Sequence, residues 1–110
     1  MTANNIKKID VNELKKRMDA NPELCLIDVR ENDEWQESHI PGAIHIPKDQ
    51  ITDRIESTTP ERNQTIYLHC KGGVRSLYAA ERLHAMGYED IYSINGGIAD
   101  WVAKGYPVVK

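Results

Sequence analysis

A cysteine followed by two glycines, with two cations nearby, is the stretch of the sequence best suited to chemistry. Cys70 follows an apolar run and precedes Gly72 and Gly73, and Lys71 and Arg75 lie in the same stretch. Because glycine adopts backbone angles closed to other residues, the loop can curl around the sulfur and turn its N–H groups inward. Those groups, the unpaired N–H groups of a following helix and the two cations would each stabilise an anion at the sulfur. The pattern therefore predicts a reactive thiolate at Cys70.

The size of the pKa shift decides whether this thiolate matters. A cysteine with a pKa near 8.5 is only about 3% thiolate at pH 7. Lowering the pKa by about two units, within the range seen at helix N-termini, makes it mostly thiolate and corresponds to roughly 2.7 kcal/mol. The same geometry would hold a persulfide, Cys–S–S⁻. Cys25, by contrast, lies in an apolar run without a nearby cation, so we expect a small hydrophobic residue of the core there.

Length, charge and hydropathy bound the class of protein. A chain of 110 residues is one domain's worth of material, so we expect a single domain over residues 1–110. Fourteen Lys and Arg against seventeen Asp and Glu give a net charge of −3, which does not support a nucleic-acid partner. No stretch approaches the ~20 apolar residues of a membrane span, and the N-terminus lacks the apolar core of a signal peptide. We therefore expect a cytoplasmic protein with no membrane partner, and two cysteines are too few for a disulfide framework.

Strand-like runs alternate with helical runs along the chain. The expected strands are 6–9, 24–29, 43–46, 65–69 and 91–94. A capping box at Asp10–Glu13 predicts a helix that ends near residue 20, and a second, short helix is expected over 31–37. An apolar stripe predicts a third helix that ends before Gly87, and a fourth is expected around Trp101. Residues 48–62 stay unassigned. This alternation predicts an α/β fold with a central, mostly parallel five-stranded sheet and helices on both faces. Ligands bind beyond the carboxyl ends of strands in such sheets, which is where Cys70 falls.

Three groups of motifs follow one another along the chain. They are Asp28-Val29-Arg30 with Glu34-Trp35 and the run from His39 to Pro47, then Cys70 to Ser76, and lastly Gly87-Tyr88 through Asn95-Gly96-Gly97 to Trp101. Together they resemble the motifs of a known family, the single-domain rhodanese or rhodanese-like sulfurtransferase. Their order and spacing over residues 28–101 make the set specific, although each motif alone would be weak. One departure is Ser38, where the family usually has glycine before the His-Ile-Pro-Gly run.

The resemblance implies a rhodanese-like fold and a double-displacement sulfur transfer through a persulfide on Cys70. The residues that it implies for substrate binding are the rest of the loop: Lys71, Gly72, Gly73, Val74, Arg75 and Ser76. The donor would be a small anion such as thiosulfate, and the acceptor cyanide, a thiol or a sulfur-carrier protein. No cofactor is implied. No metal-ligand spacing appears either, because the two cysteines are far apart and no histidine pair sits at i, i+4.

Several individual roles stay open. Arg75 suits an anionic donor through its planar guanidinium, but it could instead pair with a carboxylate at a helix end. Lys71 either contacts the donor or is a solvated loop residue. We expect Ser76 to cap the helix rather than to act in catalysis. His69 should point away from the Cys70 side of the strand, and a histidine base is not required if the loop lowers the pKa.

Two further features have a structural interpretation. Asp28, Arg30 and Glu34 are expected to form an electrostatic brace beside the loop. Gly96-Gly97 matches neither G-x-x-x-x-G-K-[ST] nor G-x-G-x-x-G, so we interpret it as a turn.

Competing functions remain beside the thiosulfate enzyme. One is a sulfur-relay module that passes persulfide sulfur between proteins for cofactor or tRNA thiolation. Another is a catalytically silent binding domain, which the intact cysteine loop disfavours. A phosphatase or arsenate reductase is disfavoured by loop length, because the resemblance links C-x4-R to sulfurtransferases and C-x5-R to phosphatases.

Overall fold

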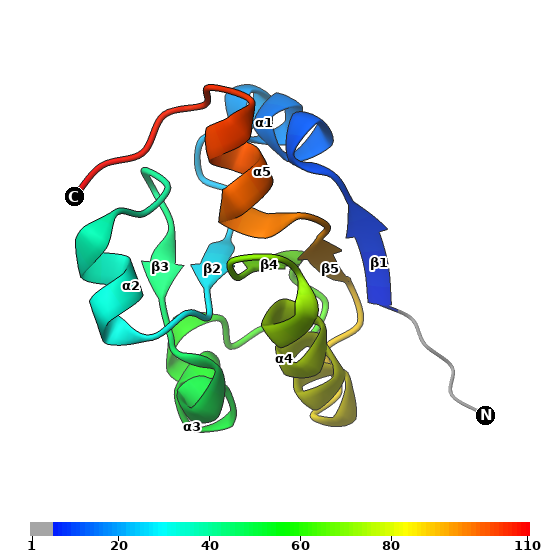
Figure 1. Ribbon diagram of the computed structural model, residues 1–110. Coiled ribbons are helices and arrows are strands. Elements are labelled where there is room, and N and C mark those ends of the chain that lie inside the picture. Colours follow the sequence, from blue (N-terminus) through cyan, green and yellow to red (C-terminus); the bar gives the residue numbers. More distant parts are fainter. Residues whose placement is uncertain (1–5) are drawn as a thin grey trace.

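A five-stranded parallel sheet forms the centre of the molecule. The computed structural model describes residues 6–110, so residues 1–5 of the expected domain lie outside the described residues. The strands are β1 (Ile6–Ile9), β2 (Leu26–Asp28), β3 (Ile44–His45), β4 (Ile66–His69) and β5 (Ile91–Ile94). They lie in the order β1-β5-β4-β2-β3, and each neighbouring pair is parallel (Figure 1). The predicted α/β fold is confirmed, and β4, which leads to Cys70, is the middle strand.

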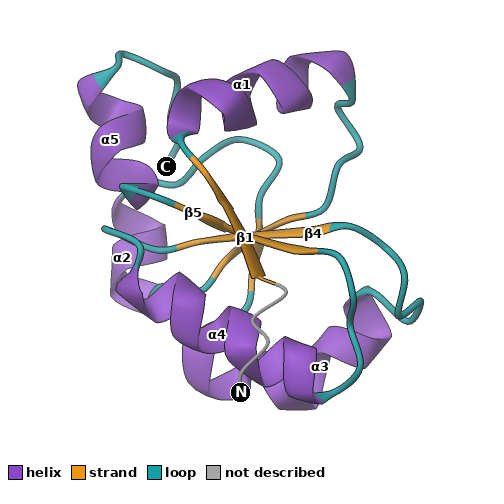
Figure 2. Cartoon of the chain, turned by 90° about the vertical axis from the view of Figure 1, so that its right-hand side faces the viewer, coloured by secondary structure: helices purple, strands orange, loops and turns teal. Residues whose placement is uncertain are grey.

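Helices cover both faces of this sheet. They are α1 (Val11–Ala20), α2 (Asn32–Glu37), α3 (Ile51–Thr58), α4 (Val74–Ala85) and α5 (Gly97–Ala103), with a short 3₁₀ helix, η1 (Lys48–Gln50), before α3. Figure 2 shows α1 and α5 on one side of the strands and α3 and α4 on the other. The region that the sequence left unassigned is thus mostly helical. Within residues 6–110, no helix combines the length and apolar character needed to cross a bilayer.

The core is divided by the sheet into two clusters. Leu26 belongs to the cluster beneath α1 and α5, whereas its neighbour Ile27 belongs to the one beneath α3 and α4. Successive strand residues point to opposite faces, so an apolar run such as this one fills both layers. Cys70 is a member of the second cluster and is only 1% exposed. The side chain of the candidate nucleophile is therefore packed in the core rather than exposed on a loop.

The caps at the helix ends agree only in part with those predicted from the sequence. Asp10 caps α1 by accepting the Glu13 N–H at 2.9 Å, but the Glu13 carboxylate bonds Arg17. A complete capping box occurs instead at α2, between Glu31 and Glu34. Gly87 follows the end of α4 with a φ of +97°, which confirms its predicted place just past the helix.

Candidate active site

The Cys70 sulfur lies just past the carboxyl end of β4, against the loop that leads into α4. Its Sγ accepts a hydrogen bond from the Gly73 N–H at 3.0 Å, and the Ser76 hydroxyl lies 3.8 Å away. The structure thus brings the cysteine, the glycines and the helix start together around one sulfur atom. A backbone N–H placed in this way can hold a thiolate or the inner sulfur of a persulfide.

Two opposing effects set the ionisation of this thiol. Burial raises the pKa of Cys70, because an apolar environment disfavours the charged form. The backbone N–H groups of Ser76, Gly73 and Gly72, together with the Ser76 hydroxyl, lower that pKa. The hydrogen bonds prevail, and the pKa of Cys70 lies below its ordinary value. Main-chain donors, rather than a histidine, therefore favour the thiolate.

The two glycines of the loop have different roles. Gly73 has a φ of +115° and is the N-cap of α4, so its backbone needs a residue without a side chain. Gly72 has no positive φ, and a Cβ added there would meet nothing within 4 Å. The expectation that both glycines use angles closed to other residues is therefore wrong for Gly72.

Ser76 does not cap the helix, contrary to the sequence-based expectation. The N-cap is Gly73, and the Ser76 hydroxyl donates to the Gly73 carbonyl at 3.2 Å. The same hydroxyl lies 2.8 Å from Oγ of Ser93 on β5, and both serines are buried. Ser93 therefore helps to orient a group that faces Cys70. No sequence motif points to Ser93, because its contact with Ser76 depends on strand register.

Gly96-Gly97 supports the loop from the other side and is more than a turn. The N–H groups of Ile98 and Ala99 at the start of α5 donate to the carbonyls of Cys70 and Lys71, at 2.9 and 3.1 Å. A Cβ on Gly97 would lie 2.3 Å from the Cys70 oxygen and 2.6 Å from the Lys71 oxygen. Only glycine permits this approach, so Gly97 fixes the first part of the loop.

The two cations of the loop differ in their partners. Arg75 donates from both terminal nitrogens to the Glu34 carboxylate, at 2.7 and 3.0 Å. The Glu34 carboxylate also accepts the Glu31 N–H, which closes the α2 capping box. The hydrogen bonds from Arg75 lower the pKa of Glu34 to about 2. Lys71 is exposed, and no ion pair holds it within the described residues.

The expected brace consists of two separate ion pairs. Asp28 and Arg30 form a buried pair, with Arg30 Nη2 2.8 Å from Asp28 Oδ2 and 2.7 Å from the Ser38 carbonyl. Glu34 belongs to the Arg75 pair instead. His69 is fully buried with Nε2 3.6 Å from Asp28 Oδ2, and burial lowers its pKa, so we treat it as a neutral core residue.

Cys25 occupies a different environment. It precedes β2, near the amino end of the strands, and is 8% exposed. Its Sγ lies 3.5 Å from Oγ1 of Thr59, and burial raises the pKa of the Cys25 thiol. The structure supports the expectation of a small core residue there.

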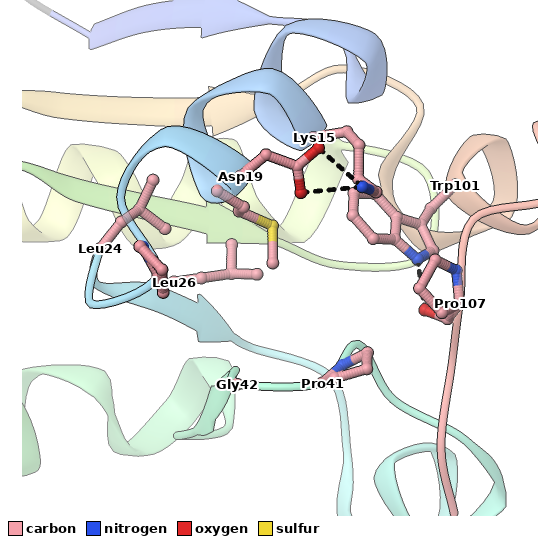
Figure 3. A pocket seen from close by; sticks show the side chains of 10 residues that line it. Lys15, Asp19, Leu24, Leu26, Pro41, Gly42, Trp101 and Pro107 are labelled. Carbon is pink, nitrogen blue, oxygen red and sulfur yellow. Dashed lines mark hydrogen bonds and ion pairs between the residues drawn. The ribbon is translucent and has the colours of Figure 1, made fainter.

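Two pockets bear on where a ligand could bind. One, of about 230 Å³, lies among Leu24, Leu26, Trp101 and the Pro41-Gly42 turn (Figure 3). The Lys15 and Asp19 side chains in its lining pair with each other, and the Trp101 Nε1–H donates to the Pro107 carbonyl. None of residues 70–76 lines it, so it is separate from the cysteine site. The other, of about 350 Å³, borders the loop at Lys71 and Glu34.

Fold and site together define an α/β domain whose buried cysteine, at the end of the middle strand, is hydrogen-bonded by the amides of a short loop. The family model for the rhodanese-like domain matches residues 10–104. The chain therefore belongs to the rhodanese-like domain family.

Known relatives fit this assignment. The putative sulfur carrier protein YrkF of Bacillus subtilis is 32% identical over 102 residues, covering 93% of this chain and 54% of that protein. This chain thus spans about half the length of that relative. The thiosulfate sulfurtransferase PspE of Escherichia coli is 38% identical over 74 residues, covering 67% of this chain and 70% of that protein. The rhodanese-like domain of the Anabaena protein Alr3790 matches with a TM-score of 0.84 and 30% identity, over 93% of this chain and 77% of that one. The names of YrkF and PspE refer to sulfur carriage and sulfur transfer.

Proposed function

We propose that the protein is a sulfurtransferase that moves a sulfane sulfur from thiosulfate or another persulfide donor to a thiophilic acceptor. The reaction proceeds through a persulfide on Cys70. The observation that carries this proposal is the 3.0 Å hydrogen bond from the Gly73 N–H to the Cys70 sulfur, within a loop whose donors favour the anion. The similarity to PspE, a thiosulfate sulfurtransferase by name, supports thiosulfate as the donor.

The reaction has two half-reactions. The Cys70 thiolate attacks the outer sulfur of thiosulfate, the S–S bond of the donor breaks, and its electron pair leaves on sulfite. The acceptor then attacks the outer sulfur of the persulfide, and the electron pair of the broken bond returns to Cys70 as a thiolate. An S–S bond of ~2.05 Å moves the outer sulfur away from the buried Cys70 side chain. The N–H groups of Gly72 and Gly73 stabilise negative charge in both half-reactions.

The rest of the loop binds and orients the donor in this proposal. Lys71 and Arg75 supply positive charge, with Arg75 held in place by Glu34. The Ser76 hydroxyl oxygen lies 3.8 Å from the sulfur, and Val74 is exposed at the start of α4.

Relay between proteins is a second candidate, favoured by apolar surface next to the nucleophile. Besides Val74, Val102 of the pocket beside the loop is 52% exposed. Exposed apolar side chains around a buried nucleophile suit a protein partner that delivers or takes the sulfur. YrkF, named as a sulfur carrier, supports this candidate. A steady-state assay with thiosulfate and cyanide separates the two, since a relay module shows a high KM or no turnover.

Intact-protein mass spectrometry after incubation with thiosulfate tests the proposal. We expect the mass of one added sulfur, mapped by peptide analysis to Cys70 and removed by cyanide. Cys70→Ser should abolish the addition and the turnover. Cys25→Ser, the matched control, should keep both and lose some stability through a buried hydroxyl. Sulfur found on Cys25, or none on either cysteine, would contradict the proposed function.

A further inference from the structure

The pocket beside the loop of residues 70–76 is lined by side chains of both charges and by apolar side chains. Its volume of about 350 Å³ lies within the range of ~300–1,000 Å³ common for small-molecule sites. Glu34 and Glu37 come from α2, Lys71 comes from the loop, and Ile98 and Val102 come from α5. Lys71, the residue after Cys70, is the residue of the Cys70 loop that lines this pocket, and Cys70 itself does not line it.

Two of the charges in the lining are already neutralised. Glu34 is bound by both terminal nitrogens of Arg75. Arg30 is bound to Asp28 and to the Ser38 carbonyl. The other charged members of the lining are Glu37 and Lys71, which are exposed and form no ion pair with each other or with another residue in the described part of the chain.

Folding does not account for the positions of these two charges. Glu37 is the last residue of α2, whose last turn has no basic residue, and a helix C-terminus disfavours a negative charge. Lys71 lies two residues before the Gly73 N-cap of α4, where the helix dipole disfavours a cation. A carboxylate and an ammonium placed against the local field, on one pocket, are complementary to a ligand that carries the opposite charges.

We propose that this pocket binds the acceptor, and that the acceptor is a small thiol carrying both an ammonium and a carboxylate group. Glu37 receives the ammonium, Lys71 receives the carboxylate, and the short carbon chain lies on Ile98 and Val102. The amino-acid thiol cysteine has this chemistry. The inference rests on the proposed persulfide chemistry at Cys70 and adds the class of acceptor to it.

The transfer itself balances without a further reagent. The acceptor thiol loses its proton to solvent, and its thiolate attacks the outer sulfur of the Cys70 persulfide. A new S–S bond forms on the acceptor while the bond to Sγ of Cys70 breaks. The electron pair returns to Cys70, so the products are an acceptor persulfide and the Cys70 thiolate.

Single-turnover transfer from the loaded protein tests the pocket. The protein is loaded with thiosulfate, freed of donor, and its added sulfur is verified by mass before any acceptor is mixed in. Four acceptors vary the charges: cysteine carries both, cysteine methyl ester the ammonium, N-acetylcysteine the carboxylate, and 2-mercaptoethanol neither. Rates of sulfur loss are followed against acceptor concentration and expressed per thiolate, which removes the differences in acceptor pKa.

We expect cysteine to saturate the loaded protein at the lowest concentration. Glu37→Gln should raise the half-saturating concentration about three- to fivefold for cysteine and its methyl ester, the size of one partly exposed ion pair, and leave N-acetylcysteine unchanged. Lys71→Gln should weaken N-acetylcysteine and cysteine but not the methyl ester. Glu89→Gln is the control, because Glu89 is exposed and does not line the pocket.

The outcomes separate the two proposals. Absence of added sulfur at the loading step would overturn the proposed function and this inference with it. If the protein loads normally but the rate of sulfur loss per thiolate depends on concentration equally for all four acceptors, the inference alone would be overturned. Acceptor binding at this pocket is likewise overturned if Glu37→Gln behaves like Glu89→Gln with every acceptor.

Discussion

At the scale of the residue, the two cysteines show how surroundings decide reactivity. Both are buried, and burial alone raises the pKa of a thiol. The Cys25 sulfur lies 3.5 Å from the Thr59 hydroxyl oxygen, whereas the Cys70 sulfur accepts a hydrogen bond from the Gly73 N–H at 3.0 Å. The chemical difference between the two side chains therefore comes from the backbone N–H groups of Gly72, Gly73 and Ser76, together with the Ser76 hydroxyl.

The pH dependence of alkylation should reveal this difference. Because the pKa of Cys70 is lowered, its reaction with iodoacetamide should titrate with a midpoint below that of a free thiol measured in parallel. Cys25 should react slowly throughout, since its thiol is buried and its pKa is raised. Rates are followed by peptide mapping between pH 5 and 10. A midpoint for Cys70 at or above that of a free thiol would rule out the stabilised thiolate.

A double substitution should separate the two roles of Arg75. Arg75→Ala removes a cation and also leaves the Glu34 carboxylate without its partner beside the loop. We expect the KM for thiosulfate to rise about tenfold with a smaller fall in kcat, as for lost ground-state binding. If repulsion of the donor by the unpaired Glu34 carboxylate causes most of that effect, adding Glu34→Gln to Arg75→Ala should return the KM for thiosulfate close to that of the unsubstituted protein. A double variant as impaired as Arg75→Ala would instead show that Arg75 contacts the donor directly.

At the scale of the element, the loop is held between the starts of two helices. Gly73, the N-cap of α4, donates its N–H to the sulfur, and Ile98 and Ala99 at the start of α5 donate to the carbonyls of Cys70 and Lys71. β5 contributes Ser93 behind Ser76. A loop fixed on both sides keeps its donors in place during the reaction, which is what electrostatic stabilisation requires.

Substitution of Gly97 should disturb this support. Gly97→Ala places a Cβ against the backbone oxygens of Cys70 and Lys71, so we expect a loss of stability of about 3 kcal/mol or more and a strong fall in activity. Gly105→Ala is the matched control. Gly105 also has a positive φ, +79°, but a Cβ there meets nothing within 4 Å, so only the backbone cost of about 1 kcal/mol applies. Chemical denaturation and the sulfur-loading assay measure both effects. Equal losses in the two variants would contradict the proposed support.

Sequence reasoning succeeded where the determinants are local. The strands, the helix stripe ending at Gly87 and the cysteine loop are each legible in a few consecutive residues, and the structure has these elements in place. It failed where distant residues meet. The Glu34–Arg75 pair joins residues 41 positions apart, and the Ser76–Ser93 contact joins residues 17 apart. Such contacts depend on the order and register of the strands, which hydrophobic periodicity does not reveal.

At the scale of the whole molecule, α2 is held beside the sheet without contributing a side chain to the buried core. It has no buried residue, so polar and ring contacts must hold it beside the sheet. Trp35 stacks on His39 with ring centroids 3.6 Å apart, and Glu34 connects the helix to the Cys70 loop through Arg75. Because α2 also contributes Glu37 to the pocket beside the Cys70 loop, the Glu34–Arg75 pair connects the helix that lines this pocket to the loop.

Acid should weaken this connection over a defined range of pH. The pKa of Glu34 is about 2 in the folded protein, below the ordinary value of 4.5, so its ion pair contributes fully above about pH 4.5 and is lost as the pH falls toward 2. The pair is 27–29% exposed, and with solvent screening we expect it to contribute about 1–2 kcal/mol. Glu34→Gln should lower the free energy of unfolding by that amount at pH 7. Urea denaturation of both proteins between pH 2 and 7 should show the difference shrinking as the acid titrates Glu34, whereas a constant difference would mean that the carboxylate charge does not hold α2 to the loop.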